Sequence, residues 1–485
     1  MRRLTFLILL FLLTLPLTAF QGIINIDDPG PNTWFFAWEP VDIDGIVAFN
    51  TEGESNVVIN GVEPVTPTYR IDDQTILMTL EYDAGTRQFV RLTPDSATPM
   101  GPAHDESSGY ILLDYAAPWA LFSPVRPFRE RNPILLLNVE TGDWEILEAM
   151  TFIRNCCVFS DDGRFLRYIK QILLDENTFD AIYELTERDM NTGEERTIHS
   201  VTSDGEPLSY TGYSHNSDGS AWVERQMDTS QEPRAFTFRL IDLTGNIEEL
   251  DLLDGRAVVY YYVGDDLAVQ DISCGEDCEI LLQQAADGEL VRYPIFDENY
   301  AVGQAVRVDD VLLTLGANSQ RLAPGTSPRL LFEMSRGFIT RDPISPDGAY
   351  TYTIGYNDDG EVISAEVLDV AADTVVYDLP LDPEGRQFID GTMLGSWMVM
   401  RNLINNGNNG LFNWRTGESY TFIAPGWTQL DVVDDSQIII GRMAGNDPNL
   451  GLSLLDLESD EETLLLPGRH ALISGIDLRN FELNR

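Results

Sequence analysis

Hydrophobic residues in this chain fall in short runs bounded by Gly, Asp, Asn and Pro. Clear examples cover residues 75–80, 134–137, 257–262 and 437–440. Runs of about four to eight residues between turn formers predict β-strands rather than long amphipathic helices. Residues 177–188 fit a helical face and an alternating strand equally well, and we interpret them as a strand because their neighbours are strands. The pattern therefore predicts an all-β protein.

One turn signature recurs along the chain: an apolar residue, a short acidic turn and a new apolar run. Copies lie at residues 69–76, 159–166, 213–222, 344–350, 389–394 and 433–438. We place the segment from Cys274 to Cys278 at an equivalent position, before the apolar run that starts at Glu279. A signature that recurs in this way indicates a repeat architecture.

A second signature, a Thr-Gly turn between two strands, lies later in each repeat. Its glycines are Gly142, Gly193, Gly245 and Gly417, and degenerate copies lie at Asp373 and Asp460. The first three glycines are 51 and 52 residues apart, and the turns at 373, 417 and 460 are 44 and 43 residues apart. Such turns need positive backbone angles, and Asp or Ser side chains hydrogen-bond their backbone. Each repeat then holds four short strands, and stacking these small sheets radially predicts a β-propeller.

These turns resemble the repeats of TolB-type, WD-like propellers, which also form the propeller domain of dipeptidyl and prolyl peptidases. The Ser-x-Asp-Gly turn at 345–348 and the Thr-Gly-Glu turns at 192–194 and 416–418 carry the resemblance. It covers most of residues 67–467, whereas 21–66 and 300–340 match poorly. The resemblance implies a single propeller over residues 20–485, with eight four-stranded blades, or seven as the alternative. Pairing of strands from the two ends of the chain should close it.

Peptidase activity does not follow from the resemblance. In those enzymes the propeller accompanies an α/β-hydrolase domain, whose nucleophile lies in a Gly-x-Ser-x-Gly turn. The closest string here, Gly212–Asn216, lacks the last glycine and lies in a predicted blade turn. No segment remains that is long enough for a hydrolase domain.

The charge of the chain excludes some partners. Its 485 residues are 43% hydrophobic and 10% aromatic, enough for a packed core, but 79 Asp and Glu against 31 Lys and Arg give a net charge of −48. This field repels nucleic acid and anionic membrane surfaces. Arg126, Arg129 and Arg131 form a local exception, since three arginines within six residues could bind an acidic ligand or partner. Pairing with the protein's own excess carboxylates is the interpretation that we favour.

The first residues predict export. Arg2 and Arg3, the apolar run from Leu4 to Leu17 and the small Ala19 match the layout of a secretory signal peptide over residues 1–19. No later stretch is long enough to span a membrane. We therefore expect a secreted, periplasmic or cell-surface associated protein without a membrane span in its mature form.

Export would place the four cysteines in an oxidising compartment, where disulfides form and persist. We expect a disulfide between Cys274 and Cys278, which lie in one tight acidic turn. The adjacent Cys156 and Cys157 could form a strained vicinal disulfide, stay as buried thiols or divide between partners. The spacing of the two pairs does not match a zinc site.

Catalytic chemistry has little support in the sequence. The four histidines, His104, His199, His215 and His470, are scattered, and paired carboxylates such as Asp161/Asp162, Asp358/Asp359 and Asp434/Asp435 fit structural roles in turns. We expect no catalytic residues and no cofactor, although residues 42–45 and 357–360 offer oxygen ligands for calcium. The aromatic string 34–38 could be a binding platform, but core packing explains it better.

Two functions follow from this pattern. The first is a secreted, non-enzymatic propeller that binds a protein, peptide or glycan. The alternative is an extracytoplasmic hydrolase or lyase with its site at the propeller centre.

Overall fold

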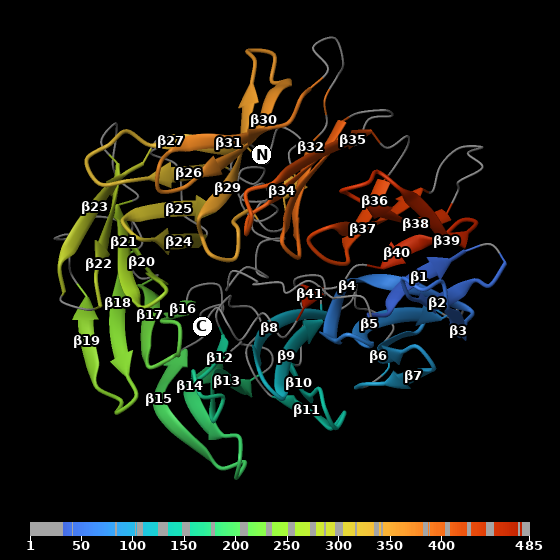
Figure 1. Cartoon of the computed structure of the whole chain (residues 1–485). Helices are drawn as coiled ribbons and strands as arrows, with labels where there is room; N and C mark the ends of the chain where they lie inside the picture. The colour runs from blue at the N-terminus through green and yellow to red at the C-terminus, as the bar shows by residue number, and fades with distance from the viewer. Residues whose placement is uncertain are drawn as a thin grey trace, which may run out of the picture. The chain divides into compact units, whose positions relative to one another are not determined.

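A computed structural model of the chain (Figure 1) describes residues 33–477 with internal gaps, and the following refers to the described residues. The gaps are residues 41, 83–84, 102, 104–109, 125–133, 148–155, 176–179, 204–211, 229–234, 251–257, 272–277, 286–287, 296–303, 316–317, 334–338, 341–342, 382–386, 388, 403–407, 424–427, 443–450 and 474–475.

The described residues form an all-β structure of ten sheets, in two compact units. Unit 1 contains Ile111–Leu330, and unit 2 contains Phe20–Tyr110 and Leu331–Asn484. Each unit holds five sheets, in which consecutive strands pair antiparallel, as they do in propeller blades. The prediction of a β-propeller of four-stranded blades is therefore confirmed.

The five blades of unit 1 each use four strands in chain order. They are β8 (Tyr110–Ala116), β9 (Trp119–Pro124), β10 (Ile134–Asn138) and β11 (Trp144–Leu147); β12 (Cys157–Phe159), β13 (Phe165–Asp175), β14 (Asp180–Asp189) and β15 (Glu195–Ser203); β16 (Gly212–His215), β17 (Ala221–Asp228), β18 (Ala235–Asp242) and β19 (Ile247–Leu250); β20 (Val258–Val263), β21 (Asp266–Asp271), β22 (Glu279–Gln283) and β23 (Leu290–Pro294); and β24 (Gln304–Val308), β25 (Val311–Leu315), β26 (Asn318–Leu322) and β27 (Arg329–Glu333).

The blades of unit 2 are less regular, because two of them take strands from the end of the chain and one is reduced to three strands. They are β1 (Phe35–Glu39), β2 (Gly45–Phe49) and β3 (Ser55–Asn60) with β40 (Ala471–Ile473); β4 (Val62–Asp72), β5 (Thr75–Tyr82), β6 (Arg87–Thr93) and β7 (Ser96–Pro99) with β41 (Ile476–Asp477); β29 (Tyr350–Tyr356), β30 (Val362–Asp369) and β31 (Thr374–Asp378); β32 (Ile389–Leu394), β33 (Trp397–Asn402), β34 (Asn408–Asn413) and β35 (Ser419–Ile423) with β28 (Ile339–Thr340); and β36 (Thr428–Val432), β37 (Gln437–Arg442), β38 (Gly451–Asp456) and β39 (Glu462–Pro467).

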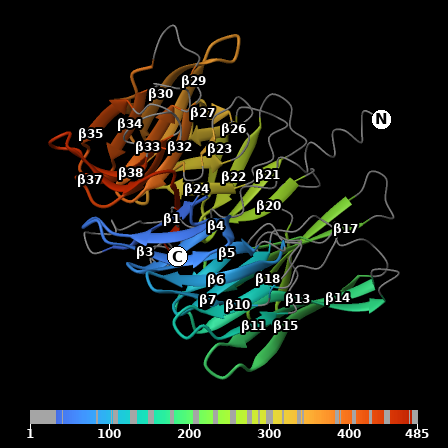
Figure 2. The same cartoon turned by 90° about the vertical axis from the view of Figure 1, so that its right-hand side faces the viewer.

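The predicted pairing between the two ends of the chain is present in unit 2. Strand β40 pairs antiparallel with β1, joining Leu472 to Ala37, and β41 pairs parallel with β4. Figure 2 shows β4 to β7 side by side in this sheet. Both pairings cover a strand edge that would otherwise expose unpaired backbone groups.

Apolar cores lie between successive blades of each unit. In unit 1, Ile169 and Tyr183 of the β12–β15 blade pack in one cluster with Trp222 and Ile241 of the β16–β19 blade. Further clusters join β8–β11 to β12–β15, β16–β19 to β20–β23, and β20–β23 to β24–β27. A four-stranded sheet has two apolar faces and buries both in this way, which explains why the blades stack face to face.

The blade number predicted from the sequence, eight or seven, is wrong. The two additional blades, β1–β3 with β40 and β24–β27, come from the segments that matched the repeat poorly. Their first turns contain no glycine at the left-handed position, because Asp44 and Asp309 adopt positive φ angles of 49° and 53° themselves. Asp thus takes the left-handed position that glycine occupies in the clear copies, and the Gly45 that follows Asp44 already belongs to β2.

Two segments that we predicted as copies of the first recurring turn occupy other places in their blades. The segment from Cys274 to Cys278 lies between β21 and β22, the second and third strands, and the first turn of that blade is Val263–Asp266. Ile389 to Gly391 lies within strand β32 rather than in a turn. The uncertain segment at 177–188 is a strand where it is described, since β14 starts at Asp180.

The two recurring turns occupy fixed places in the blades. We call the turn between the first and second strands of a blade its first-hairpin turn, and that between the third and fourth its last-hairpin turn. In several last-hairpin turns an Asp or Asn accepts hydrogen bonds from the backbone N–H groups two and three residues on, as Asp189 does from Asn191 and Thr192 at 2.9 and 3.2 Å. Gly193 then adopts a φ of 73°. The predicted side-chain and glycine roles are confirmed here.

Candidate functional site

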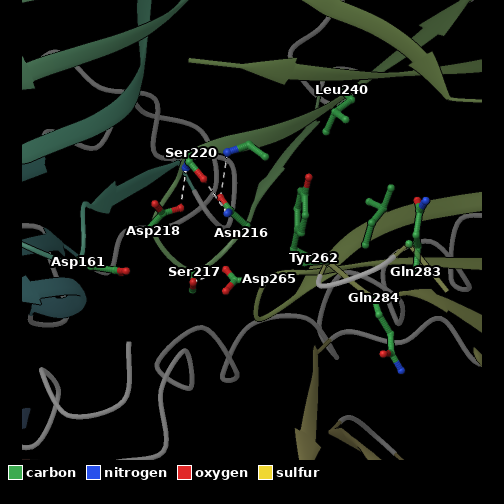
Figure 3. A pocket seen from close by; sticks show the side chains of 14 residues that line it. Asp161, Asn216, Ser217, Asp218, Ser220, Leu240, Tyr262, Asp265, Gln283 and Gln284 are labelled. Atoms are coloured by element: carbon green, nitrogen blue, oxygen red, sulfur yellow. Dashed lines mark hydrogen bonds between the residues drawn. The ribbon is translucent and has the colours of Figure 1, made fainter. Parts of the chain in front are cut away.

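A polar pocket in unit 1 is the candidate site (Figure 3). Its volume is about 500 Å³, and it lies at the first-hairpin turns of three successive blades and one last-hairpin turn. The lining residues are Asp161, Asn216, Ser217, Asp218, Ser220, Ala221, Leu240, Tyr262, Asp265, Leu267, Gln283, Gln284, Ala285 and Gly288. Three carboxylates and three amides line it, whereas none of these residues is a cation. The lining therefore favours ligands that donate hydrogen bonds or carry positive charge.

The turn from Asn216 to Ser220 supplies one wall and is rigid for local reasons. The Asn216 Oδ1 accepts the backbone N–H of Ala221 at 2.9 Å, and its Nδ2 donates to the Ser220 hydroxyl at 2.9 Å. The Asp218 carboxylate accepts the Ser220 N–H at 2.9 Å. Figure 3 shows these three side chains converging on one another. Side chains held in this way are preorganised for binding.

The neighbouring blade supplies the opposite wall through Tyr262 and Asp265. The hydroxyl of Ser217 donates to the Asp265 carboxylate, which joins the first-hairpin turns of the two blades. Behind the turn, the Tyr262 N–H donates to the Ser214 hydroxyl at 3.1 Å. Burial raises the pKa of the Tyr262 hydroxyl to about 12, and the Asp265 charge adds to the shift. The phenol is therefore a neutral donor at physiological pH.

Asp218 is held ionised by its surroundings. Burial acts to raise its pKa, but hydrogen bonds from Ser220 and the charge of Arg167 outweigh burial and lower it below the ordinary value. Arg167 is itself buried, donates to the Asp218 carbonyl and forms an ion pair with Glu187 at 2.9 Å. The Arg167 guanidinium is thus already paired with Glu187 and the Asp218 carbonyl. The Asp218 carboxylate lines the pocket as a hydrogen-bond acceptor.

A second polar cluster lies between the β12–β15 and β16–β19 blades. Glu224 is completely buried and accepts the Tyr213 hydroxyl at 2.8 Å. His199 Nε2 lies 3.6 Å and Arg239 Nη1 lies 3.8 Å from the same carboxylate. Because Glu224 is sealed from solvent, a substrate cannot reach it, and we assign the cluster to blade packing.

The sequence predictions for site residues have mixed outcomes. Arg126, Arg129 and Arg131 lie outside the described residues, so their role in ligand binding stays a prediction. His104 also lies outside them. His215 packs against Trp222 with ring centroids 4.8 Å apart, and the Nε2 of His470 lies 3.1 Å from the Pro467 carbonyl. These contacts hold the two rings in place, and the absence of a catalytic role stays a prediction.

The cysteine predictions are partly outside the described structure. Cys278 is buried and disulfide-bonded, but Cys274 lies outside the described residues, so the pairing itself stays a prediction. Cys156 and Cys157 are both buried, and this structure shows no bond between them.

The aromatic string near the start of the chain is core. Phe35 and Phe36 are fully buried in two different clusters, one on each side of β1. The strand therefore packs on both faces, whereas alternation would have left one face exposed.

Calcium binding stays a prediction. Among the described residues no group of three His, Cys, Asp or Glu side chains is arranged to hold a metal. In the turn at 357–360, Asn357 accepts the Asp359 and Glu361 N–H groups at 3.1 and 2.8 Å, which is the structural role expected of such a turn.

Sequence reasoning missed the pocket, although it had marked several of the turns that form it. The sequence predicts the turns at 159–166 and 213–222, but only as structural turns. Tyr262 and Asp265 were missed because the first-hairpin turn of their blade was assigned to the Cys274 segment. The signal available was the Gly264-Asp265-Asp266 string after an apolar run.

In the described part of the chain, no helix is long and apolar enough to cross a bilayer.

The chain was compared with known proteins. No family model and no curated protein matches it. Similar solved structures include TolB from Acinetobacter baumannii, 14% identical, covering 57% of this chain and 64% of that one, with a TM-score of 0.30. The oligogalacturonate lyase from Vibrio parahaemolyticus is 13% identical, with coverages of 81% and 97% and a TM-score of 0.33.

The β-propeller domain of the Trilobed protease from Pyrococcus furiosus is 12% identical over 73% of this chain and 95% of that one, with a TM-score of 0.31. The chain spans less than two thirds of the length of the TolB structure. All three TM-scores are low, so the assignment of propeller blades rests on the strand order of the sheets. No function of these proteins is assigned to this chain.

Proposed function

We propose that this chain is a non-enzymatic, extracytoplasmic β-propeller protein that binds a peptide segment carrying lysine or arginine in the pocket of unit 1. The observation that carries the proposal is the lining, with three carboxylates, three amides and no cation. Leu240, Leu267 and the Tyr262 ring offer apolar surface for the aliphatic stem of such a side chain. The carboxylates then meet its charged head.

Long-range electrostatics support the same class of ligand. A net charge of −48 attracts cationic segments and repels anionic ones before contact. Such steering weakens as salt is added, because exposed charges are screened over about 8–10 Å at physiological ionic strength. Binding should therefore weaken with salt mainly through a slower association rate.

The test is calorimetric titration of the protein with lysine- and arginine-containing peptides, compared with peptides in which norleucine or citrulline replaces the charged residue. We expect binding of the charged peptides alone. The variant Asp265→Asn should bind about 10- to 100-fold more weakly, since a hydrogen bond to a charged group is worth about 1.5–3 kcal/mol.

Asp456→Asn is the matched control. It removes the same charge from a half-buried position at a last-hairpin turn that does not line the pocket, so it should change the affinity less than about twofold. Equal binding of charged and neutral peptides, or equal effects of the two substitutions, would refute the proposal. Cleavage of a bound peptide would favour the enzymatic alternative.

The extracytoplasmic location is proposed from the signal-like segment 1–19. Mass spectrometry of the exported protein should find a new N-terminus after Ala19. Retention of the segment on protein in the cytoplasm would contradict it.

A further inference from the structure

The thiols of Cys156 and Cys157 lie closer together than two separate sulphur atoms can rest. Their Sγ atoms are 2.7 Å apart, and both residues are buried, at 3% and 4% exposure. Non-bonded carbon atoms settle about 3.5–4.0 Å apart, and sulphur is no smaller. Bonded sulphurs are about 2.0 Å apart. The pair is therefore held well inside contact distance, where a covalent bond would relieve the overlap.

Cys156 and Cys157 lie together at the start of strand β12. Successive side chains of a regular strand point to opposite faces, which separates neighbouring sulphurs. Here the strand β12 starts at Cys157, and Cys156 stands just before it. The Cys156 carbonyl accepts the Ile169 N–H at 2.9 Å, while Cys157 pairs with Tyr168 in the ladder. This hydrogen bond continues the β12–β13 register to Cys156, and both cysteine side chains nonetheless belong to the same apolar cluster.

The surroundings do not favour a thiolate at this place. Burial raises the pKa of Cys157 well above its ordinary value, and the contact with Cys156 and the charge of Asp114 raise it further. The Asp114 carboxylate is itself buried and accepts the Phe159 N–H at 2.6 Å. Thiolates are the species that exchange with disulfides, so the buried pair reacts slowly once the blade has packed.

We propose that Cys156 and Cys157 form a vicinal disulfide, made while the chain folds under oxidising conditions and sealed when the β8–β11 and β12–β15 blades pack. In this step the two thiols lose two protons and two electrons and form one S–S bond. A disulfide compound takes up the electrons and protons by thiol–disulfide exchange and becomes two thiols.

The bond would act locally. It closes a minimal loop, so it removes little chain entropy from the unfolded state and contributes little to global stability. It fixes the backbone immediately before β12 and removes two oxidisable thiols from the core between two blades. The inference does not depend on ligand binding or on export, since it is tested on refolded protein.

The test is a thiol map of protein refolded in a mixture of reduced and oxidised glutathione. The protein is denatured without reductant, alkylated and cut with trypsin. Cleavage after Arg154 and Arg164 releases residues 155–164, which contain these two cysteines and no other. We expect this peptide unalkylated and lighter than the dithiol form by two hydrogen atoms. It should take up two alkyl groups only after reduction.

A double variant separates the two cysteine pairs. Cys274→Ser with Cys278→Ser leaves Cys156 and Cys157 as the only cysteines, and no free thiol should then be detected in the denatured protein. If that variant does not fold, the tryptic peptide of the unaltered protein still gives the answer. Two alkylated cysteines in the peptide, a glutathione adduct, or a cross-link to Cys274 or Cys278 would overturn the proposal.

Discussion

The first-hairpin turn of the β16–β19 blade and the last-hairpin turn of the β12–β15 blade use the same local chemistry in different surroundings. Both contain an Asn or Asp that accepts backbone N–H groups and a glycine at positive φ, 68° at Gly219 and 73° at Gly193. A Cβ added at Gly219 would overlap the Val158 side chain of the neighbouring blade. At Gly193 the nearest atom would be a guanidinium nitrogen of Arg188 at 3.9 Å.

This difference shows what a turn can do beyond reversing the chain. The first-hairpin turn is pressed against another blade, buries the Arg167 head beneath it and forms a pocket wall. The last-hairpin turn is exposed and stabilises its own hairpin. Local sequence therefore specifies the turn, whereas the neighbouring blade specifies its use.

The largest expected effect is the loss of Arg167. Its side chain is 6% exposed and binds both Glu187 and the Asp218 carbonyl. Arg167→Ala leaves a buried carboxylate with less compensation, and we expect the free energy of unfolding to fall by about 3–5 kcal/mol. Urea denaturation measures this.

Arg164→Ala is the control in the same blade. Arg164 pairs with Asp189 in the last-hairpin turn but is 54% exposed, so its loss should cost no more than about 1 kcal/mol. Equal costs for the two substitutions would show that the two kinds of turn do not differ as described.

A smaller effect is expected from the two glycines. Gly219→Ala and Gly193→Ala should each lower the free energy of unfolding by about 1–2 kcal/mol, because a Cβ is unfavourable at positive φ. Gly219→Ala should lose a further 1–3 kcal/mol by overpacking against Val158, roughly the cost of extra methylenes in a packed core. Thermal unfolding of the two variants compares them directly, and a larger loss at Gly193 would contradict the contrast.

The smallest expected effect is on how the free energy of unfolding depends on acidic pH. Hydrogen bonds from Thr244 and Asn246 lower the pKa of Asp242 in a last-hairpin turn to about 2. The folded-state pKa lies below the unfolded value of about 3.9. The ionised group therefore stabilises the fold above that value, and this contribution is lost as the pH falls from about 4 to 2.

Asp242→Asn should accordingly flatten the acid limb of a plot of unfolding free energy against pH and leave its neutral part nearly level. An unchanged slope between pH 4 and 2 would contradict the role assigned to Asp242.

Much of the fold could be predicted from the sequence because hairpin turns are local. The Ser160–Gly163 and Ser345–Gly348 turns form the same hydrogen bonds, each with a serine hydroxyl that donates to the Asp two residues on, at 2.6 Å. Glycine at positive φ and an Asp beside it are visible in the letters alone. The strand order within each blade follows from these turns.

The blade number was not visible in the same way. Asp44 and Asp309 themselves take the positive φ angle in their turns, so the two blades that contain them depart from the clear copies, in which glycine takes it.

The sequence by itself determined a repeated four-stranded blade, a strongly acidic chain and the turn residues, because each depends on neighbours a few positions away. Tertiary structure alone decided that Ser217 meets Asp265, that Glu224 is sealed beside His199, and that β40 completes the first blade. These contacts join residues 48, 25 and more than 400 positions apart. Burial and hydrogen bonding at such distances depend on which blade faces which, and no local pattern encodes that.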